Sequence, residues 1–216
     1  MKELVAILRP ALVSLLVFTG LLGIAYPLVI GGVGAAAFPE QARGSLVRDA
    51  SGKLAGSALI GQPFDEPAYF WGRPTAIAAY QAMTSGGTNA GPSGFVDREG
   101  ALGPNPALID AVRARIRALR DADPGNTAPV PVDLVTASAS GLDPHITPAA
   151  AYYQLGRVAR ARGAAEAQLR ELVDRHVEER TLGVLGERRV NVLRLNLALD
   201  SRLGPPRPQV RPRLQP

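Results

Sequence analysis

The run TASASGLDPHITP, residues 136–148, holds the residue types that a hydrolase would use for nucleophilic catalysis. Ser138 and Ser140 could supply a nucleophile, and His145, one of only 2 histidines in the chain, follows Asp143 after a single proline. An activated serine needs a base within hydrogen-bond reach and commonly stands on a strained G-x-S-x-G turn. Neither serine stands in that motif, and the spacing does not by itself pair the aspartate with the histidine. A membrane-anchored exported hydrolase that uses His145 with Asp143 or a serine is therefore kept as an alternative.

A structural role accounts for the same run. Asp143 precedes a proline and can accept a backbone hydrogen bond as an Asx turn. Thr147 before Pro148 is typical of a helix N-cap followed by a first-turn proline. The small residues at 136–141 allow close packing against another surface. We therefore expect a helix to begin at Pro148 and the preceding run to serve as a contact loop.

Other catalytic and ligand-binding motifs are missing from the sequence. The chain has no cysteine, and two histidines offer few ligands for a transition metal. The second histidine, His176, is predicted to lie on a solvated helix face. Gly52 and Lys53 are followed by leucine, whereas a phosphate-binding loop continues with Ser or Thr. The sequence thus predicts no catalytic residue, no metal site and no intrinsic cofactor.

The positive charge of the chain lies at its two ends. The whole sequence has a net charge of +5, but residues 10–200 hold 18 basic and 18 acidic side chains. A nucleic-acid-binding domain usually concentrates basic residues on a folded face. The distribution argues against a nucleic-acid partner, and the basic, proline-rich residues 201–216 are interpreted as a disordered tail.

An uncharged segment between Arg9 and Glu40 is long enough to cross a membrane. A transmembrane helix needs about 20 apolar residues, whereas the apolar part of a cleaved signal peptide has about 7–15. Although residues 35–37 resemble a cleavage site, the length favours a retained anchor over residues 10–37. Basic residues flank both ends, so the positive-inside rule barely discriminates. We expect residues 1–9 in the cytoplasm and the following domain outside it.

Small residues recur along the predicted membrane helix at steps of three or four, which places them on one face. Such residues let a second helix approach closely, and packing of this kind drives association in lipid. The proline in the series should also kink the helix. We therefore predict that a partner helix packs on this face, which we call the small-residue face. It consists of Gly20, Gly23, Pro27, Gly31 and Gly34.

The remaining sequence, residues 38–200, predicts a mixed α/β domain. A hairpin with a turn at Gly52 is expected within residues 46–61. Start signals and apolar spacing predict several helices. These cover residues 74–81, 105–120, 147–163 and 164–179. Residues 84–106 are expected to form a long loop, and residues 189–200 fit a strand and a helix equally well.

Several separated segments together resemble the KdpC family, the small membrane-anchored subunits of the high-affinity potassium-transporting Kdp ATPase. They follow one another in order over nearly the whole chain up to Asp200, and as a set they are highly specific. They comprise RPA at 9–11, YP at 26–27, GSALIGQPF at 56–64, YFWGRPTA at 69–76, SGGTN at 85–89, PVPVDLVTASASGLDPHITPAAA at 129–151, RVARARG at 157–163 and RVNVLRLNLALD at 189–200.

The resemblance implies a single-pass protein of the bacterial cytoplasmic (inner) membrane, with its N-terminus inside and an extracytoplasmic α/β domain. Its partners would be the channel-like KdpA, the ATP-hydrolysing KdpB and the small KdpF, and potassium would be the transported ion. The family acts without chemistry of its own. It stabilises the complex and, as a catalytic chaperone, raises the ATP affinity of the ATPase subunit through a ternary complex with ATP. The residue that the resemblance associates with the nucleotide is Gln154.

A domain outside the membrane cannot touch cytoplasmic ATP, so an effect on ATP affinity would have to pass through the membrane subunits as a coupling free energy. We therefore expect the domain to dock on the channel-like subunit through three loops. The candidate docking residues are Tyr69, Gly72, Arg73, Pro74, Ser85, Gly86, Gly87, Asn89, Ser138, Asp143 and His145. Besides the hydrolase, the other alternative is an anchored scaffold protein of unrelated complexes.

Overall fold

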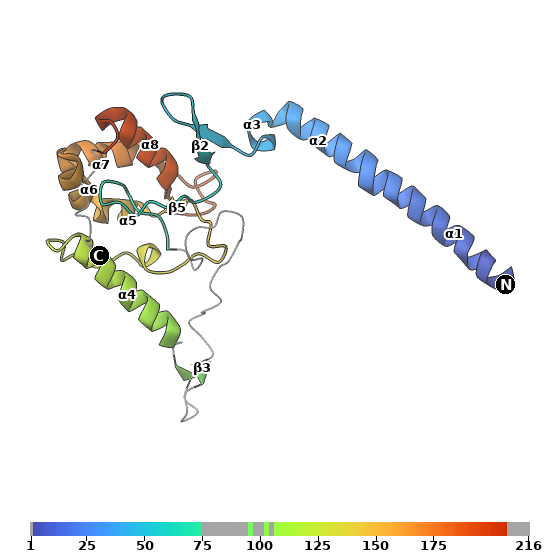
Figure 1. The fold of residues 1–216 in the computed structure, drawn as a ribbon, viewed down its shortest axis with the longest axis horizontal. Helices are drawn as coiled ribbons and strands as arrows, with labels where there is room; N and C mark the ends of the chain where they lie inside the picture. Colours follow the sequence, from blue (N-terminus) through green and yellow to red (C-terminus); the bar gives the residue numbers. More distant parts are fainter. Residues whose placement is uncertain (1, 75–94, 97–101, 104–105, 207–216) are drawn as a thin grey trace, which may run out of the picture. The chain divides into compact units, whose positions relative to one another are not determined.

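A computed structural model describes residues 2–74, 95–96, 102–103 and 106–206 (Figure 1). The chain forms two compact units, residues 1–46 and residues 47–216. The predicted helix at 74–81, much of the predicted loop at 84–106 and the end of the tail lie outside the described residues. The same holds for the four candidate docking residues between Ser85 and Asn89.

The N-terminal unit is a long helix made of three consecutive segments. These are α1 (Lys2–Phe18), the π-helical η1 (Thr19–Ala25) and α2 (Tyr26–Ala37), and the short α3 (Pro39–Ala42) follows them. Residues 6–37 form a largely apolar helical span of 32 residues, and its most apolar window has no buried residue. At 1.5 Å per residue they extend about 48 Å, against a hydrocarbon core of about 30 Å. The described residues thus contain one helix long and apolar enough to span a membrane, and its candidate span, Ala6–Ala37, includes the predicted anchor at residues 10–37.

Pro27 disturbs the regular α-helix one turn earlier in the chain. Proline has no backbone N–H, and its ring collides with the carbonyl of the residue four positions earlier, which is Gly23. The π-helical η1 ends directly before Tyr26, and its wider turn accommodates the crowded carbonyl. The expected disturbance is therefore present as a widened turn, and the helix continues beyond it as α2.

Within the described N-terminal unit, the glycines of the small-residue face have open space beside them. A Cβ atom added at Gly20, Gly31 or Gly34 would meet nothing within 4 Å, and at Gly23 it would meet only the methyl group of Thr19 at 3.9 Å. The glycines therefore leave space that the helix itself does not fill.

The predicted hairpin joins β1 (Leu46–Arg48) to β2 (Leu54–Ser57) in a two-stranded sheet. Asp49 fixes its turn, because the Asp49 carboxylate accepts from the backbone N–H groups of Ser51 and Lys53 at 2.9 and 3.0 Å. Gly52 supplies the positive φ of 83° that the turn needs.

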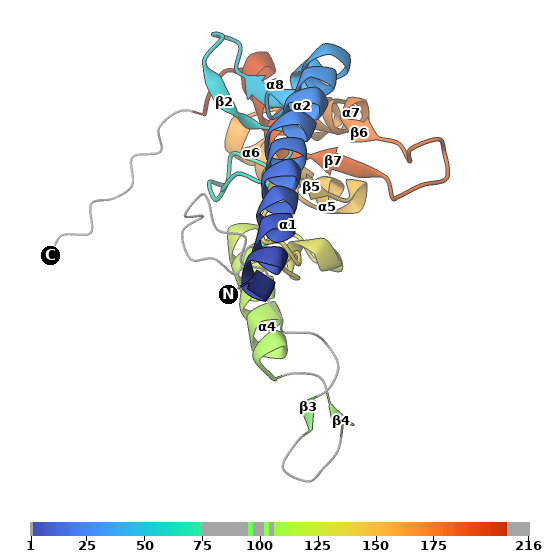
Figure 2. The same ribbon diagram turned by 90° about the vertical axis from the view of Figure 1, so that its right-hand side faces the viewer.

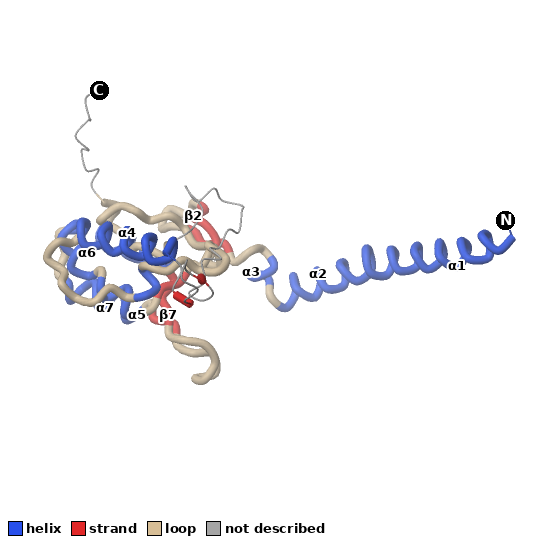
Figure 3. The backbone as a smooth tube through the Cα atoms, turned by 90° about the horizontal axis from the view of Figure 1, so that it is seen from below, coloured by secondary structure: helices blue, strands red, loops and turns tan. Residues whose placement is uncertain are grey.

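Helices supply most of the domain core. They are α4 (Pro106–Ala122), the 3-10 helix η3 (Val132–Leu134), α5 (Pro148–Tyr153), α6 (Leu155–Arg162), α7 (Glu166–Arg175) and α8 (Val192–Leu203). Figures 1 and 3 show α5, α6 and α7 grouped together. One cluster of buried apolar side chains joins these helices with Leu119 of α4 and with Phe70 from an irregular segment. Its largest members are Phe70, Leu155, Leu169, Leu195 and Leu199.

A small antiparallel sheet of order β5-β7-β6 adjoins the helices (Figure 2). Its strands are β5 (His145–Ile146), β6 (Val177–Glu178) and β7 (Arg189–Asn191). The predicted helix 164–179 was wrong at its end, because α7 stops at Arg175. Val177 pairs with Val190 in the sheet, and this long-range pairing outweighs the local helical spacing.

The ambiguous residues 189–200 contain both predicted structures in succession. Their first three residues form β7, and α8 then begins at Val192. The helix starts there because Asn191 Oδ1 accepts from the Arg194 N–H at 3.1 Å as an N-cap. The predicted loop at 84–106 also contains structure, since β3 (Phe95–Val96) pairs antiparallel with β4 (Leu102–Gly103). The mixed α/β class is confirmed, with short strands.

Helix signals in the run TASASGLDPHITP act as predicted. Thr147 Oγ1 accepts from the Ala150 N–H at 3.1 Å and caps α5. The helix predicted at 147–163 is divided at Gln154 into α5 and α6. Gly163, with a φ of 63°, then ends α6 in the left-handed conformation that favours glycine.

Thr147→Ala removes this cap and should lower the free energy of unfolding by about 1 kcal/mol. Urea unfolding of the full chain in detergent can be followed by the fluorescence of Trp71, its single tryptophan. The exposed Thr127 is the matched control, and Thr127→Ala should leave the unfolding midpoint in place. Equal losses in the two variants would contradict the capping role.

Candidate functional site

We call residues 67–73 the strip; side chains of the surrounding helices hold its backbone. Asn196 of α8 accepts from the Phe70 N–H and donates to the Phe70 carbonyl, both at 2.9 Å. Gln154, between α5 and α6, binds the next residue in the same way, with 2.8 Å to the Trp71 N–H and 3.1 Å to the Trp71 carbonyl. Two buried side-chain amides thus satisfy consecutive backbone groups that no neighbouring strand reaches among the described residues.

Arg157 of α6 binds the strip from the same side. Its guanidinium donates to the Pro67 carbonyl at 2.6 Å and to Gln154 Oε1 at 2.5 Å. It also lies 4.1 Å from the centroid of the Trp71 ring, a cation–π contact. Burial lowers the pKa of Arg157 to about 10, so the side chain stays charged at neutral pH.

Arg162 and Asp200 fix the start of the strip. Arg162 donates to the Ala68 carbonyl and to Asp200, at 2.7 Å in each case. The Tyr69 hydroxyl donates to the second oxygen of Asp200 at 2.9 Å, and burial raises the pKa of Tyr69. Tyr69 was predicted to be a docking residue, but these contacts hold it against α6 and α8.

The bonds of Gln154 use its entire amide. Its oxygen accepts from Trp71 and Arg157, and its nitrogen donates to the carbonyls of Trp71 and Ala150. A primary amide has two N–H donors and two acceptor positions on its oxygen. Gln154 is also only 1% exposed. The residue that the resemblance associates with ATP is a fully bonded core residue in this structure.

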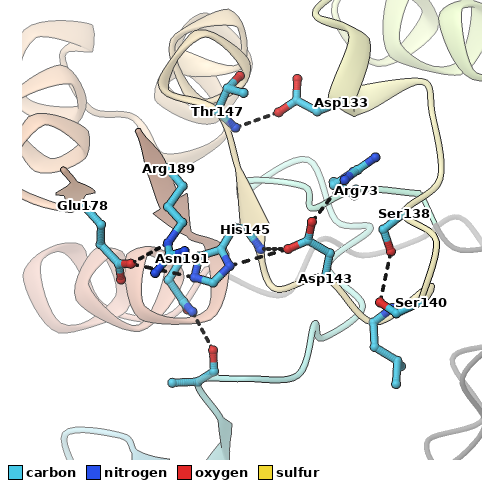
Figure 4. Close-up of polar contacts among 12 residues, drawn as sticks. Arg73, Asp133, Ser138, Ser140, Asp143, His145, Thr147, Glu178, Arg189 and Asn191 are labelled. Atoms are coloured by element: carbon cyan, nitrogen blue, oxygen red, sulfur yellow. Dashed lines mark hydrogen bonds and ion pairs between the residues drawn. The ribbon is translucent and has the colours of Figure 1, made fainter. Parts of the chain in front are cut away.

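An ion pair joins the strip to the run TASASGLDPHITP (Figure 4). Arg73 lies 3.1 Å from Asp143 Oδ2, and its second terminal nitrogen donates to the carbonyls of Thr136 and Ala137 at 3.4 and 3.3 Å. Hydrogen bonding from the His145 side chain is the main cause that lowers the pKa of Asp143 to about 2, and Arg73 adds to it. Two loops predicted to dock are therefore fixed to one another.

Asp143 also forms the predicted Asx turn. Its Oδ1 accepts from the His145 N–H at 2.9 Å and lies 3.5 Å from His145 Nδ1. The other ring nitrogen of His145 lies 3.9 Å from Glu178 Oε2. Ser138 Oγ accepts from the Gly141 N–H at 2.8 Å. Both histidine nitrogens thus face carboxylates and Ser138 stabilises its own loop, an arrangement that does not support serine hydrolysis.

Arg73 lines two surface recesses. One, of about 610 Å³, is lined by residues that include Leu59, Ile60, Arg73, Ser138, Ser140, Leu142 and Asp143. The other, of about 420 Å³, is formed by Phe64, Trp71, Arg73, Arg115, Leu119 and Leu134, and includes the predicted residues Gly72 and Pro74. We call the residues of the first recess the docking surface. Leu59 and Ile60 are 62% and 45% exposed there.

The residues that hold the strip, above all Asn196, Arg157 and Arg162, were not predicted from the sequence as site residues. One signal was available for Asn196. Asn196 shares a helix face with Val192 and Leu199, which predicts that its side-chain amide is buried among apolar residues. Buried amides are hydrogen-bonded. Nothing local indicated that its partner would be Phe70.

The low pKa of Asp143 makes part of the stability pH-dependent. A carboxylate whose folded-state pKa is depressed stabilises the fold above its unfolded pKa, and this contribution disappears as the pH falls through the folded value. The free energy of unfolding of the wild type should exceed that of Asp143→Asn by a constant amount above about pH 4. This difference should shrink towards pH 2. Urea unfolding at a series of pH values measures it. The exposed Asp110 provides the control, Asp110→Asn, and a pH-independent difference for Asp143→Asn would contradict the assignment.

Comparisons with known proteins agree over most of the chain. Residues 8–201 match the family described as "KdpC: K+-transporting ATPase, c chain". The chain is 59% identical over 199 residues to the potassium-transporting ATPase KdpC subunit of Sorangium cellulosum, which covers 91% of this chain and 98% of that protein. It is 56% identical over 195 residues to the subunit of the same name from Methylococcus capsulatus, with coverage of 89% and 96%. The chain therefore belongs to the KdpC family of K+-transporting ATPase c chains.

Proposed function

We propose that the chain is a non-catalytic accessory subunit of a high-affinity, ATP-driven potassium uptake complex. Its N-terminal helix anchors it in the bacterial cytoplasmic membrane with the N-terminus inside, and its domain lies on the extracytoplasmic side. There the domain docks on the channel-like KdpA and stabilises an assembly that also contains KdpB and KdpF. Membership of the KdpC family and the apolar helix at residues 6–37 support this proposal.

The observation that carries the docking proposal is the Arg73–Asp143 ion pair. It joins two segments that are 70 residues apart in the sequence and aligns them around the exposed Leu59 and Ile60. Apolar side chains beside polar groups with fixed positions are typical of interfaces between subunits.

The docking surface is also rigid before a partner arrives. Gly61 donates its backbone N–H to the Leu142 carbonyl at 2.8 Å, and a Cβ at Gly61 would come within 2.8 Å of the Asp143 carbonyl. The hairpin end and the Asp143 loop are thus packed too closely for independent movement. A surface that is already ordered loses less conformational entropy on binding.

The membrane helix provides a second contact. Its small-residue face is open, and lipid-embedded helices associate through such faces. Because one chain carries both contacts, binding at one raises the effective concentration at the other. We propose that this two-point attachment alters the ATP affinity of KdpB, as a coupling free energy that passes through KdpA. Potassium is then the ion that the complex transports.

The docking proposal predicts that Arg73→Ala and Asp143→Ala each reduce the recovery of KdpA with the tagged chain by roughly 10-fold or more, as for the loss of a charged hydrogen bond. The double variant should lose less than the two single losses combined, because each single variant already breaks the shared ion pair. The measurement is purification in mild detergent from the host grown at limiting potassium.

Arg113→Ala is the matched control for this experiment, since Arg113 belongs to an exposed pair with Asp110 at 3.8 Å. Its complex should be recovered as for the wild type. Single variants at Arg73 and Asp143 that assemble and transport potassium normally would contradict docking through this surface.

Packing of a partner helix on the small-residue face predicts a difference in subunit copurification between two variants of the membrane helix. Gly31→Leu places a side chain where the chain itself leaves space, so the helix should form while the partner helix is kept away. Copurification of the other subunits should fall at least severalfold. Val29 lies two positions earlier, about 200° around an α-helix from Gly31, so Val29→Leu should leave the yield unchanged. Equal recovery of the two complexes would exclude the small-residue face as a contact.

A further inference from the structure

Two residues far apart in the sequence form the same contact with neighbouring residues of the strip. Asn196 binds the N–H and carbonyl of Phe70, and Gln154 binds the N–H and carbonyl of Trp71. The two amides are 1% exposed each. We call them the amide clamp. Each acts as a short length of neighbouring strand, and four backbone groups, two of them at the buried Phe70, depend on them.

The clamp lies directly before the docking surface in the chain. Trp71 is followed by Gly72 and then by Arg73, whose guanidinium binds Asp143 at 3.1 Å. Since only one residue separates Trp71 from Arg73, the position of the Trp71 backbone limits where this guanidinium can reach. Arg157, which bonds both Gln154 and the Pro67 carbonyl, ties the clamp to the start of the strip.

We propose that Gln154 and Asn196 are positioning residues that hold Arg73 at the docking surface, and that Gln154 affects the ATP affinity of the complex only through the strip. This inference rests on the proposed docking function and deepens it. It gives Asn196, a residue with no suggested link to nucleotide, the same positioning role as Gln154.

The bonding of Gln154 opposes a direct contact with ATP. All four hydrogen-bonding positions of its amide are occupied within the chain. To reach a nucleotide, Gln154 would have to leave Trp71 and Arg157, and a buried guanidinium and buried backbone groups would lose their partners. Substitution of Gln154 should instead move the strip.

The test compares Gln154→Glu with Asn196→Asp in the intact complex. Each keeps an acceptor oxygen for the strip N–H and loses the N–H that donates to the strip carbonyl. Gln168→Glu, an exposed position on α7, is the control for the chemical change itself. Hydrogen exchange of a peptide that contains Phe70 and Trp71 reports the clamp, and the KM for ATP and the half-saturating potassium concentration report function.

We expect both clamp variants to speed exchange at the strip and to raise the KM for ATP by about 5-fold, the change that follows loss of one ordinary hydrogen bond. The half-saturating potassium concentration should change in both as well, and the control should match the wild type. Should Asn196→Asp prevent assembly, Asn196→Leu and Gln154→Met, which are neutral and similar in shape, provide the same comparison.

Two results would overturn the inference. If exchange rises in both variants but only Gln154→Glu raises the KM for ATP, Gln154 acts on nucleotide by another route. If exchange rises in both and neither variant changes the kinetics, the clamp only stabilises the domain. Failure of the docking proposal itself has a different signature, because Arg73→Ala would then assemble and transport normally while the clamp variants still loosened the strip.

Discussion

Buried backbone groups without a hydrogen-bond partner are costly, and the rest of this domain is arranged around that constraint at residues 67–73. The strip crosses the core, since Phe70 is fully buried, yet no strand accompanies it among the described residues. Side chains of α6 and α8, together with Gln154 between α5 and α6, supply what a strand would. The bonds to Phe70 and Trp71 join residues 126 and 83 positions apart in the sequence. Helix packing, strip and docking surface consequently depend on one another.

This arrangement gives the proposed accessory role a physical basis. The polar residues that suggested catalysis have structural partners. Asp143 binds Arg73 and His145, and Ser138 accepts a hydrogen bond from the backbone of its own loop. What remains accessible is a surface with exposed leucine and isoleucine beside an internal ion pair. Its chemistry suits recognition of another subunit, which is what membership of the KdpC family leads one to expect.

Local signals in the sequence were sufficient for the parts of the fold that are locally determined. The apolar helix, the hairpin turn at Gly52, the Thr147 cap and the Asx turn at Asp143 each follow from residue type and immediate neighbours. Strand β6 could not be predicted, because Val177 keeps helical spacing and its strand state depends on Val190. The amide clamp could not be predicted from the sequence either. Its donors and acceptors lie in an irregular segment, and only the folded chain brings them to Asn196 and Gln154.

The central claim is that the docking surface faces the channel-like subunit, and site-specific cross-linking tests it most directly. The chain has no cysteine, so Ser140→Cys in the lining of the docking surface can carry a unique photoreactive label. Gln168→Cys, exposed on α7, carries the same label away from the recess residues. The account predicts that irradiation of the assembled complex links the chain to KdpA from position 140 and not from position 168. Linkage to KdpA from position 168 alone would contradict it.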